Sequence, residues 1–324
     1  MTAPSNWIFD SQVIQELIRC ERKAYFHFVK DLNPQTGVWN GWVPDREEPA
    51  LVFGLAWHKA MDFVWVLLHT GERRPLTLEE LTAGALNAFL KEWDLWGLDH
   101  EAYYPRAPGR AMDMISVYLT QYAQIITTCE LLSVEETFSV MLDPEGDVTY
   151  HGRMDKVIRH PVYNNKVLCM DHKTTSSFKR FNWMDSFSPN IQIDGYLHAG
   201  HSNYGEEFGG VIIDGAVVQK TDIDFTQIFV DRQFEQMDSW LWEMHYHMES
   251  FFKNYGMLLD FRSDPTHQDR AAFMPAFPKR TIACSDFGGC PYLTLCKARA
   301  NPETWDQPPH GFTQKSWNPL EVKT

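Results

Sequence analysis

The sequence lacks several features that mark common protein classes. It has no G-x-x-x-x-G-K-[ST] motif, so it lacks a P-loop for nucleotide phosphates. It contains no internal repeat and no low-complexity tract. The amino terminus, MTAPSNWIFDSQ, lacks the basic and then apolar plan of a secretory signal, and no apolar run approaches the length that a bilayer requires. We therefore expect a cytoplasmic protein with no membrane partner.

Positive charge is also scarce. The chain has 29 Lys and Arg against 43 Asp and Glu, a formal net charge of -14. Sequence-independent affinity for nucleic acid comes from Lys and Arg, so this balance argues against a protein that coats DNA. It does not exclude a nuclease, because an acidic surface can coexist with a local basic channel. Candidate residues for such a channel are Arg19, Arg22, Lys23, Lys179, Arg180, Lys279, Arg280, Lys297 and Arg299.

The length and composition predict an ordinary globular protein. With 324 residues, 44% of them hydrophobic, the chain can bury a large core. We predict one elaborated domain over residues 1–300, with a helical part at 1–132, a catalytic core at 133–231, and a helix and cysteine loop at 232–300. A loosely ordered, Pro-rich tail would follow at 301–324. Periodicity predicts helices at 9–32, 47–72, 76–96, 110–132 and 232–255, strands at 132–142, 150–158, 167–170, 208–219 and 226–230, and a loop at 260–278.

The most informative stretch runs from 150 to 196. The strands at 150–158 and 167–170 are expected to be adjacent and antiparallel, with Asp155 near the end of the first. On the second strand, Asp171 and Lys173 stand two residues apart, so their side chains leave the same face. Two acids and a lysine should therefore converge at one sheet edge.

Phosphodiester hydrolysis uses such a set. Two carboxylates can hold Mg²⁺ or Mn²⁺ and leave positions open for water and a phosphate oxygen. A neighbouring lysine can orient the attacking water, help to deprotonate it and stabilise developing charge. Gln192 and Tyr196 stand four apart on a predicted helix and share one face, where they offer neutral donors and acceptors to a nucleic-acid backbone.

In this order, the segments GRMD, DHK and QIDGY resemble the PD-(D/E)XK nuclease superfamily, in its RecB-like branch with a Q-x-x-x-Y motif. The resemblance implies that Asp155 and Asp171 are metal ligands, Lys173 the catalytic lysine, and Gln192 and Tyr196 the substrate-side motif. It also implies an α/β fold with a restriction-endonuclease-like core. In that core a mixed central sheet is flanked by helices, with a helical amino-terminal part and a cysteine-rich carboxyl-terminal part added.

Two further positions match this branch. Gly54 and His58 have the G-x-x-x-H spacing of its first motif, which implies that His58 joins the metal shell. An imidazole ligand would favour Mn²⁺ somewhat over Mg²⁺. Glu136, or else Glu135, matches the acid that precedes the first catalytic aspartate. The alternative for His58 is a histidine packed in the core, and the alternative for Glu136 or Glu135 is an exposed acid on a strand.

Three of the six cysteines lie close together near the carboxyl end. Cys284, Cys290 and Cys296 are each separated by five residues, which is typical of a metal or cluster loop. In a cytoplasmic protein, disulfides are rare. The pattern resembles the iron–sulfur nucleases of the same branch, such as AddB-type and CRISPR-adaptation nucleases, where one early and three late cysteines hold a [4Fe-4S] cluster. It implies that Cys20 is the fourth ligand.

In those nucleases the late trio begins with a two-residue gap, whereas here the gap is five residues. That difference leaves Zn²⁺ open as an alternative to the cluster. Cys129 and Cys169 fall outside the pattern and are predicted to be packing residues.

The resemblance implies a divalent-metal-dependent DNA exonuclease of recombination, repair or phage-type DNA processing. Because the chain has no motor of its own, a separate helicase or a single-strand-annealing or single-strand-binding protein is an expected partner. Two other classes stay open. One is a catalytically silent nuclease-fold protein that binds DNA or a protein around a structural centre. The other is an iron–sulfur or zinc protein with no nuclease role.

Overall fold

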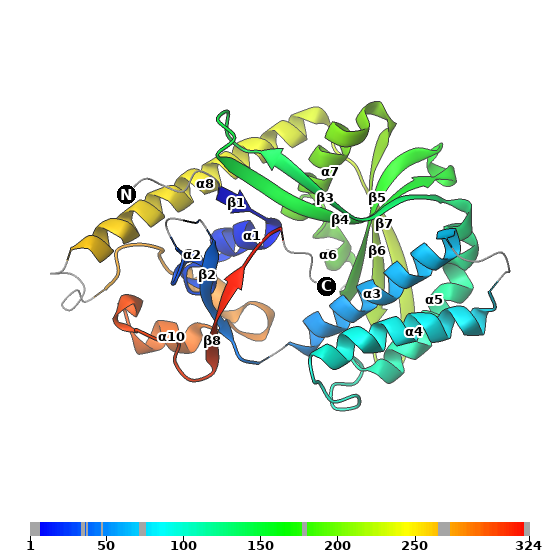
Figure 1. Cartoon of the computed structure of the whole chain (residues 1–324), viewed down its shortest axis with the longest axis horizontal. Coiled ribbons are helices and arrows are strands. Elements are labelled where there is room, and N and C mark those ends of the chain that lie inside the picture. Colours follow the sequence, from blue (N-terminus) through cyan, green and yellow to red (C-terminus); the bar gives the residue numbers. More distant parts are fainter. Residues whose placement is uncertain are drawn as a thin grey trace. The chain divides into compact units, whose positions relative to one another are not determined.

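The computed structural model describes residues 7–33, 36, 38–46, 48–70, 76–176, 180–264 and 273–320. Its contacts divide the chain into two compact units (Figure 1). Unit 1 comprises residues 1–46, 139–152 and 238–324, and unit 2 comprises 47–138 and 153–237. The first 46 residues thus belong with the carboxyl-terminal segment rather than with the helices that follow them.

Unit 2 is built on a mixed sheet. Its strands β4, β5, β6 and β7 lie in that order, and β3 pairs with β4. The β4–β5 and β6–β7 pairs are antiparallel and the β5–β6 pair is parallel, which confirms the predicted antiparallel pair and the mixed α/β class. The strand bounds are β3 (Glu130–Met141), β4 (Val148–His160), β5 (Lys166–Thr175), β6 (Phe208–Val218) and β7 (Ile223–Val230).

Helices flank this sheet. One face carries α3 (Pro49–Thr70), α4 (Leu78–Leu95) and α5 (Pro108–Thr128), whose apolar side chains share a buried core with alternate residues of the strands. Because neighbouring strand residues point to opposite sides, Asp171 and Lys173 leave the other face, where α7 (Ile191–Tyr204) packs on β5 and β6. Shorter pieces are η2 (Pro161–Tyr163), α6 (Arg180–Asp185) and η3 (Gly205–Glu207).

Helix α3 corrects one expectation. Its segment Pro49–His69 is long and apolar enough to cross a bilayer, so the prediction that no run approaches this length is wrong. Phe53, Trp57 and Trp65 are nevertheless buried in the core of unit 2, as expected for a helix that is apolar on most sides. Both predicted ends of this helix, at residues 47 and 71–72, lie outside the described residues.

Unit 1 contains a helix that the sequence predicts as continuous over 9–32. The structure instead has β1 (Trp7–Phe9), α1 (Ser11–Arg19), α2 (Glu21–Ala24) and a π-helical turn, η1 (Tyr25–Val29). Asp10 caps α1, accepting from the Val13 N–H at 2.8 Å. The break falls at Cys20, whose extended backbone ends α1 and begins α2.

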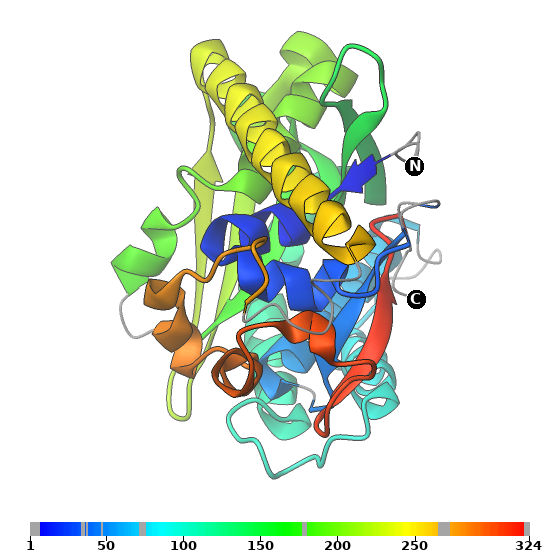
Figure 2. The ribbon, with the colours of Figure 1, turned by 90° about the vertical axis from the view of Figure 1, so that its left-hand side faces the viewer.

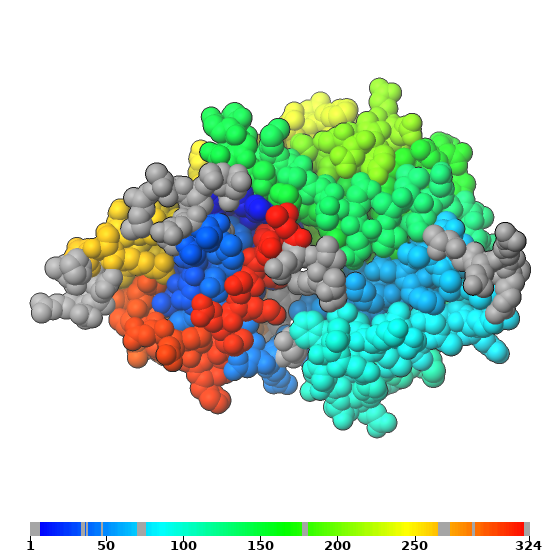
Figure 3. Space-filling model, in the orientation of Figure 1, coloured from blue at the N-terminus to red at the C-terminus, as the bar shows by residue number. Residues whose placement is uncertain are grey.

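The predicted loose tail is also wrong for part of its length. Strand β8 (Phe312–Trp317) pairs antiparallel with β2 (Trp39–Pro44), and Figure 3 shows the two side by side on the surface of unit 1. Gly41 lets β2 lie against η1, since a Cβ there would come within 2.4 Å of the Phe26 and His27 carbonyl oxygens.

The remaining elements of unit 1 surround its cysteines. Helix α8 (Phe234–Ser263) extends into the segment predicted as a loop from 260, and residues 265–272 of that segment lie outside the described part. The late cysteines lie on or beside η4 (Thr281–Gly288) and α10 (Leu293–Ala298), followed by η5 (Pro302–Thr304). Figure 2 shows η4 and α10, in orange, beside α1 and α2, in blue.

Candidate active site

The two predicted metal-binding acids meet where β4 and β5 stop pairing. The last paired residues are Lys156 and Met170, so Asp155 and Asp171 occupy the next position of the register. The backbone N–H of His172 donates to Asp155 Oδ2 at 2.9 Å. Since β5 lies between β4 and β6, the acids lie inside the sheet and Asp155 inside its strand, rather than at an edge and a strand end as predicted.

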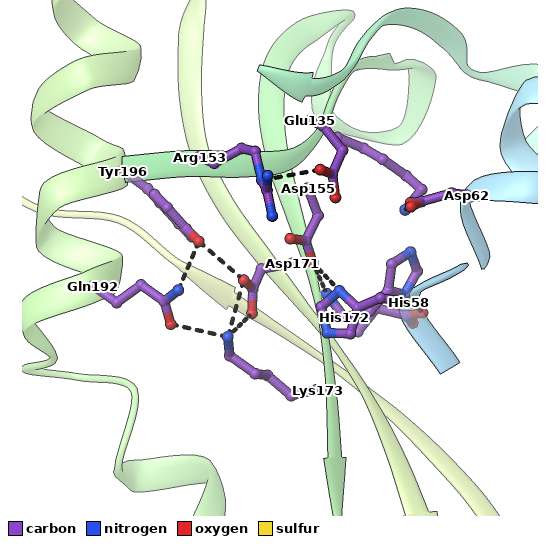
Figure 4. Close-up of polar contacts among 12 residues, drawn as sticks. His58, Asp62, Glu135, Arg153, Asp155, Asp171, His172, Lys173, Gln192 and Tyr196 are labelled. Carbon is purple, nitrogen blue, oxygen red and sulfur yellow. Dashed lines mark hydrogen bonds and ion pairs between the residues drawn. The ribbon is translucent and has the colours of Figure 1, made fainter. Parts of the chain in front are cut away.

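Four of the predicted residues form a closed hydrogen-bonded ring (Figure 4). Lys173 Nζ donates to Asp171 Oδ1 at 3.0 Å and to Gln192 Oε1 at 2.9 Å. Gln192 Nε2 donates to the Tyr196 hydroxyl at 2.8 Å, which donates to Asp171 Oδ1 at 3.2 Å. Strand β5 and helix α7 therefore present a carboxylate, an ammonium, an amide and a hydroxyl to one another.

Histidine 58 brings α3 to the same site. His58 Nδ1 lies 2.9 Å from Asp155 Oδ2. One turn earlier on α3, Gly54 faces β5, where an added Cβ would lie 3.4 Å from Thr174 Oγ1. The G-x-x-x-H spacing thus puts a small residue at the helix–strand contact and the imidazole beside the acid.

Burial and charge shift the titration of these groups in opposite directions. Burial raises the pKa of Asp171, Lys173 opposes this, and Asp155 adds to it, so the net shift is upward. Burial alone would raise the pKa of Asp155 too, but His58, Lys156 and Lys173 bring it well below its ordinary value. The two acids are therefore electrostatically distinct, although they occupy equivalent strand positions.

The nearby acids favour the cationic forms of both bases. Burial works to lower the pKa of Lys173, but Asp171 and Asp155 outweigh it, so the pKa lies above its ordinary value. Burial likewise works to lower the pKa of His58, and Asp155 again reverses the shift. In this state each acid has a protein cation as its partner.

Of the two candidate acids on β3, Glu135 lies on the side of Asp155. Glu136 accepts from the Tyr204 hydroxyl at 2.8 Å and so faces α7. Glu135 pairs with Arg153 at 3.0 Å (Figure 4), and Asp155 contributes to a pKa that burial raises above its usual value. Its φ of 56° is left-handed, so a local irregularity of β3 directs this side chain. Glu135 therefore lies beside Arg153, and Glu136 lies beside α7.

Sequence reasoning missed a buried network behind β5. His172 Nδ1 lies 2.9 Å from Asp214 Oδ2, which also accepts from the Tyr118 hydroxyl at 2.8 Å. Gln227 Nε2 donates to Asp214 Oδ1 at 3.0 Å. His172 has 0% and Asp214 2% of the side chain exposed. The signal was present in DHK, because a residue between two that face the site must point to the opposite core.

The donor types at the site suit Mg²⁺ or Mn²⁺. Asp155 and Asp171 offer hard oxygens, and their mutual repulsion contributes to the raised pKa of Asp171, which a divalent cation would relieve. Within the described ranges, however, no three His, Cys, Asp or Glu side chains are arranged to hold a metal ion. Asp171 pairs with Lys173 and Asp155 with His58.

In unit 1, the four predicted cluster cysteines are near enough to affect one another's titration. Burial raises the pKa of Cys290, and Cys20 and Cys284 add to the effect. Burial raises the pKa of Cys296 to about 11, with Cys20 and Cys290 acting in the same direction. The Arg280 backbone N–H donates to Cys20 Sγ at 3.4 Å. Grouped thiols of this kind suit a thiolate-held centre, although the described part of the chain holds no assembled metal site.

Several predicted basic residues have structural partners. Arg22 is buried, and its Nε donates to the Phe277 carbonyl at 2.9 Å, so it is unavailable to a phosphate. Lys23 pairs with Glu16 at 3.0 Å, and Lys279 Nζ donates to the Cys296 carbonyl at 3.0 Å. Lys179 and the side chain of Arg180 lie outside the described residues.

Neither a family model nor a curated protein matches the chain. Among solved structures, the chain is similar to one described as "Crystal structure of SSO0001". The identity is 14%, the match covers 58% of this chain and 85% of that chain, and the TM-score is 0.26. A similarity of this size carries no argument about fold or function.

Proposed function

We propose that this protein is a divalent-metal-dependent deoxyribonuclease with a PD-(D/E)XK core, acting as an exonuclease in DNA recombination, repair or phage-type DNA processing. The observation that carries the proposal is the hydrogen-bonded ring of Asp171, Lys173, Gln192 and Tyr196, with Asp155 and His58 beside it. The exonuclease assignment rests on the resemblance of the motifs to the RecB-like branch.

The residues of the site divide the work of phosphodiester hydrolysis. When bound by Asp155, Asp171 and His58, Mg²⁺ or Mn²⁺ would acidify a water molecule and neutralise phosphate charge. Lys173 is held as a cation beside Asp171, where it can orient the attacking water and stabilise charge that develops on the phosphate oxygens. Gln192 accepts from Lys173 through its carbonyl oxygen. Its amide nitrogen donates one N–H to Tyr196, and the second N–H can donate to the DNA backbone next to the scissile phosphate.

For unit 1 we propose a [4Fe-4S] cluster on Cys20, Cys284, Cys290 and Cys296, with Zn²⁺ as the alternative. The support is the proximity of the four thiols and the N–H donated to Cys20 Sγ. A centre there would tie α1 and α2 to η4 and α10. Its role would be structural, and DNA and a separate helicase or single-strand-binding protein would be the partners.

The test uses end-labelled linear DNA and closed circular DNA, each single- and double-stranded, with anaerobically purified protein. Mn²⁺, Mg²⁺ and EDTA are compared for wild type, Lys173→Ala and Asp171→Asn, with Lys91→Ala on the exposed face of α4 as the matched control. We expect metal-dependent loss of linear DNA in wild type and Lys91→Ala only. Equal activity of Lys173→Ala and wild type would refute the proposal. Cleavage of closed circular DNA would show that the enzyme is an endonuclease and not an exonuclease.

A folded protein that binds DNA without cleaving it under any condition would support the catalytically silent alternative instead. Circular dichroism of each variant separates lost chemistry from lost fold. His58→Ala refines the result: if His58 joins the metal shell, the Mn²⁺ concentration for half-maximal activity should rise about 10–100-fold.

A further inference from the structure

A surface cavity of about 470 Å³ lies in unit 2, where β5 and β6 begin and β7 ends. Lys166, at its wall, is five positions before Asp171 on β5. At about 3.3 Å per strand residue, the cavity is about 17 Å along the strand from the candidate active site. It is therefore a separate site, within the volume range typical of small-molecule pockets.

Aromatic side chains form part of the walls of this cavity. Tyr163 and Phe229 stack with ring centroids 4.9 Å apart, and Phe234 lies 5.8 Å from the ring of His201. Phe234 is 70% and Phe229 43% exposed, although exposed rings of this size usually find cover in a folded protein. Flat, partly exposed rings offer a stacking surface to another flat ring.

Two glycines at the start of β6 allow close packing beside the cavity. Gly209 lines the cavity, and a Cβ there would come within 2.8 Å of Lys166 Cβ. Gly210 has a φ of 138°, and its added Cβ would lie 2.9 Å from Phe229 Cζ. A side chain at Gly209 would therefore displace Lys166, and one at Gly210 would displace the Phe229 ring.

The polar groups of the cavity suit an anionic ligand with acceptor atoms. Lys166 and Arg232 contribute two cations against the single carboxylate of Asp231 among the lining residues. The Lys166 ammonium also donates to the Glu206 carbonyl, and Arg232 Nε pairs with Asp194. The Arg232 side chain is only 7% exposed. Across the described segments, Arg232 Nη2 and His201 Nε2 have no hydrogen-bond partner. Both atoms are buried away from solvent, so the cavity offers a ligand the charge of its basic side chains rather than these two atoms.

We propose that this cavity binds an unpaired nucleobase together with its phosphate, as a second contact for a single strand. The base stacks on the exposed rings of Phe229 and Phe234, and Lys166 faces the phosphate. Stacking on aromatic rings with a nearby cation is how single strands are held without sequence preference. This inference rests on the proposed function, because it makes DNA with an unpaired strand the substrate.

The geometry predicts a dependence on length. A stacked strand, at about 3.4 Å per nucleotide, needs about five nucleotides to join the cavity to Asp171. A 15-nucleotide single strand reaches both sites, whereas a stacked trinucleotide at the active site does not reach the cavity. A duplex has no unpaired base to insert.

Binding is measured by fluorescence anisotropy with end-labelled dT15, dT3 and a 15-base-pair duplex, in EDTA so that no cleavage occurs. The variants are Phe234→Ala, Phe229→Ala and Lys166→Glu, with Leu95→Ala, 72% exposed on α4, as the matched control. We expect each cavity variant to weaken dT15 binding at least about tenfold and to leave duplex binding unchanged, while dT3 reports on binding at a single site. Phe234→Ala is the variant least able to disturb the fold, because its ring is mostly exposed.

Unchanged dT15 affinity in folded Phe234→Ala and Lys166→Glu would overturn the inference, as would an equal loss of duplex binding. The result is independent of cleavage. If the wild-type protein fails the nuclease test but binds dT15 through Phe234, the cavity inference stands and the proposed activity is refuted. If the enzyme is active but these variants leave its dT15 affinity unchanged, the proposed activity stands and the cavity inference is refuted.

Discussion

Asp155 and Asp171 face each other one position beyond the last pair of the β4–β5 ladder. If the ladder continued, the two carboxylates would form a directly opposed pair and repel each other. The end of the strand pairing is therefore linked to the cations that lie beside the two acids. In place of a ladder partner, Asp155 accepts from the His172 N–H and pairs with His58, and Asp171 pairs with Lys173. Where the β4–β5 pairing ends, the two acids thus lie at positions from which both can bind one cation.

Replacing Tyr196 by Phe should reduce activity more than stability. The hydroxyl accepts from Gln192 and donates to Asp171, whereas the ring packs on Phe138 with centroids 5.9 Å apart and would be retained. We expect a loss of about 1 kcal/mol in the free energy of unfolding, and about 10–100-fold in metal-dependent cleavage. Urea denaturation and the cleavage rate measure the two effects. A variant with wild-type cleavage would show that the Tyr196 hydroxyl does not support Asp171.

Replacing Asp214 by Ala should destabilise unit 2. The change leaves the buried His172, Tyr118 and Gln227 groups without their acceptor. Loss of one member of a buried charged network costs at least about 3 kcal/mol. Urea denaturation of Asp214→Ala, against Asp113→Ala on the exposed side of α5, provides the measurement. Equal unfolding midpoints would mean that the network is dispensable.

The Glu303 carboxylate should make unit 1 sensitive to acid. Burial alone raises the pKa of Glu303, but Arg262, at 2.7 and 3.0 Å, with Lys30 and Tyr25, brings it below its ordinary value near 4.5. A lowered pKa means that the folded state favours the ionised form. Its stabilisation is therefore complete above about pH 4.5 and disappears as the pH falls through the lowered pKa.

Glu303→Gln should be less stable than wild type at pH 7, and the difference should shrink on acidification. Thermal unfolding between pH 3 and pH 7 follows this change, and Glu235→Gln, exposed at the start of α8, is the control. A difference that stays constant with pH would show that the Glu303 charge is not the source.

Anaerobically purified protein should contain iron and absorb visible light if the four cysteines hold a cluster. Cys296→Ser should lose most of this iron and unfold at a lower temperature, because the link between α2 and α10 is lost. Cys129→Ser in unit 2 should keep it, since Cys129 lies apart in the core with α3 and α5. Zinc in place of iron would support the alternative metal, and no metal in either protein would count against any centre.

The sequence predicted the local features of the candidate site better than its surroundings. Asp171 and Lys173 share a face because strand side chains alternate, and Gln192 and Tyr196 share one because they stand one helical turn apart. These relations need only neighbouring residues. The direction of the Glu135 side chain depends instead on a left-handed residue inside β3, which no local pattern marks.

Long-range partners explain the larger errors. The β8 strand exists because β2 pairs with it, and Trp317 Nε1 donates to Asp10 Oδ2 at 2.9 Å. Composition at 301–324 is rich in proline and polar residues and predicts a loose tail, because pairing with a distant strand is not visible locally. The helix break at Cys20 has the same origin, because its thiol accepts from the backbone N–H of the distant Arg280.

The way in which unit 1 is assembled from three stretches of the chain sets an order for its synthesis. Unit 2 lies entirely within residues 47–237, so a nascent chain can complete it while the ribosome still holds the remainder. Strand β2 emerges early but has no β8 to pair with until residue 317 has been made. Nascent chains that stop near residue 260 should therefore protect β5 and α7 from protease while leaving Trp39 and its neighbours open to cleavage, and completion of the chain should close them together.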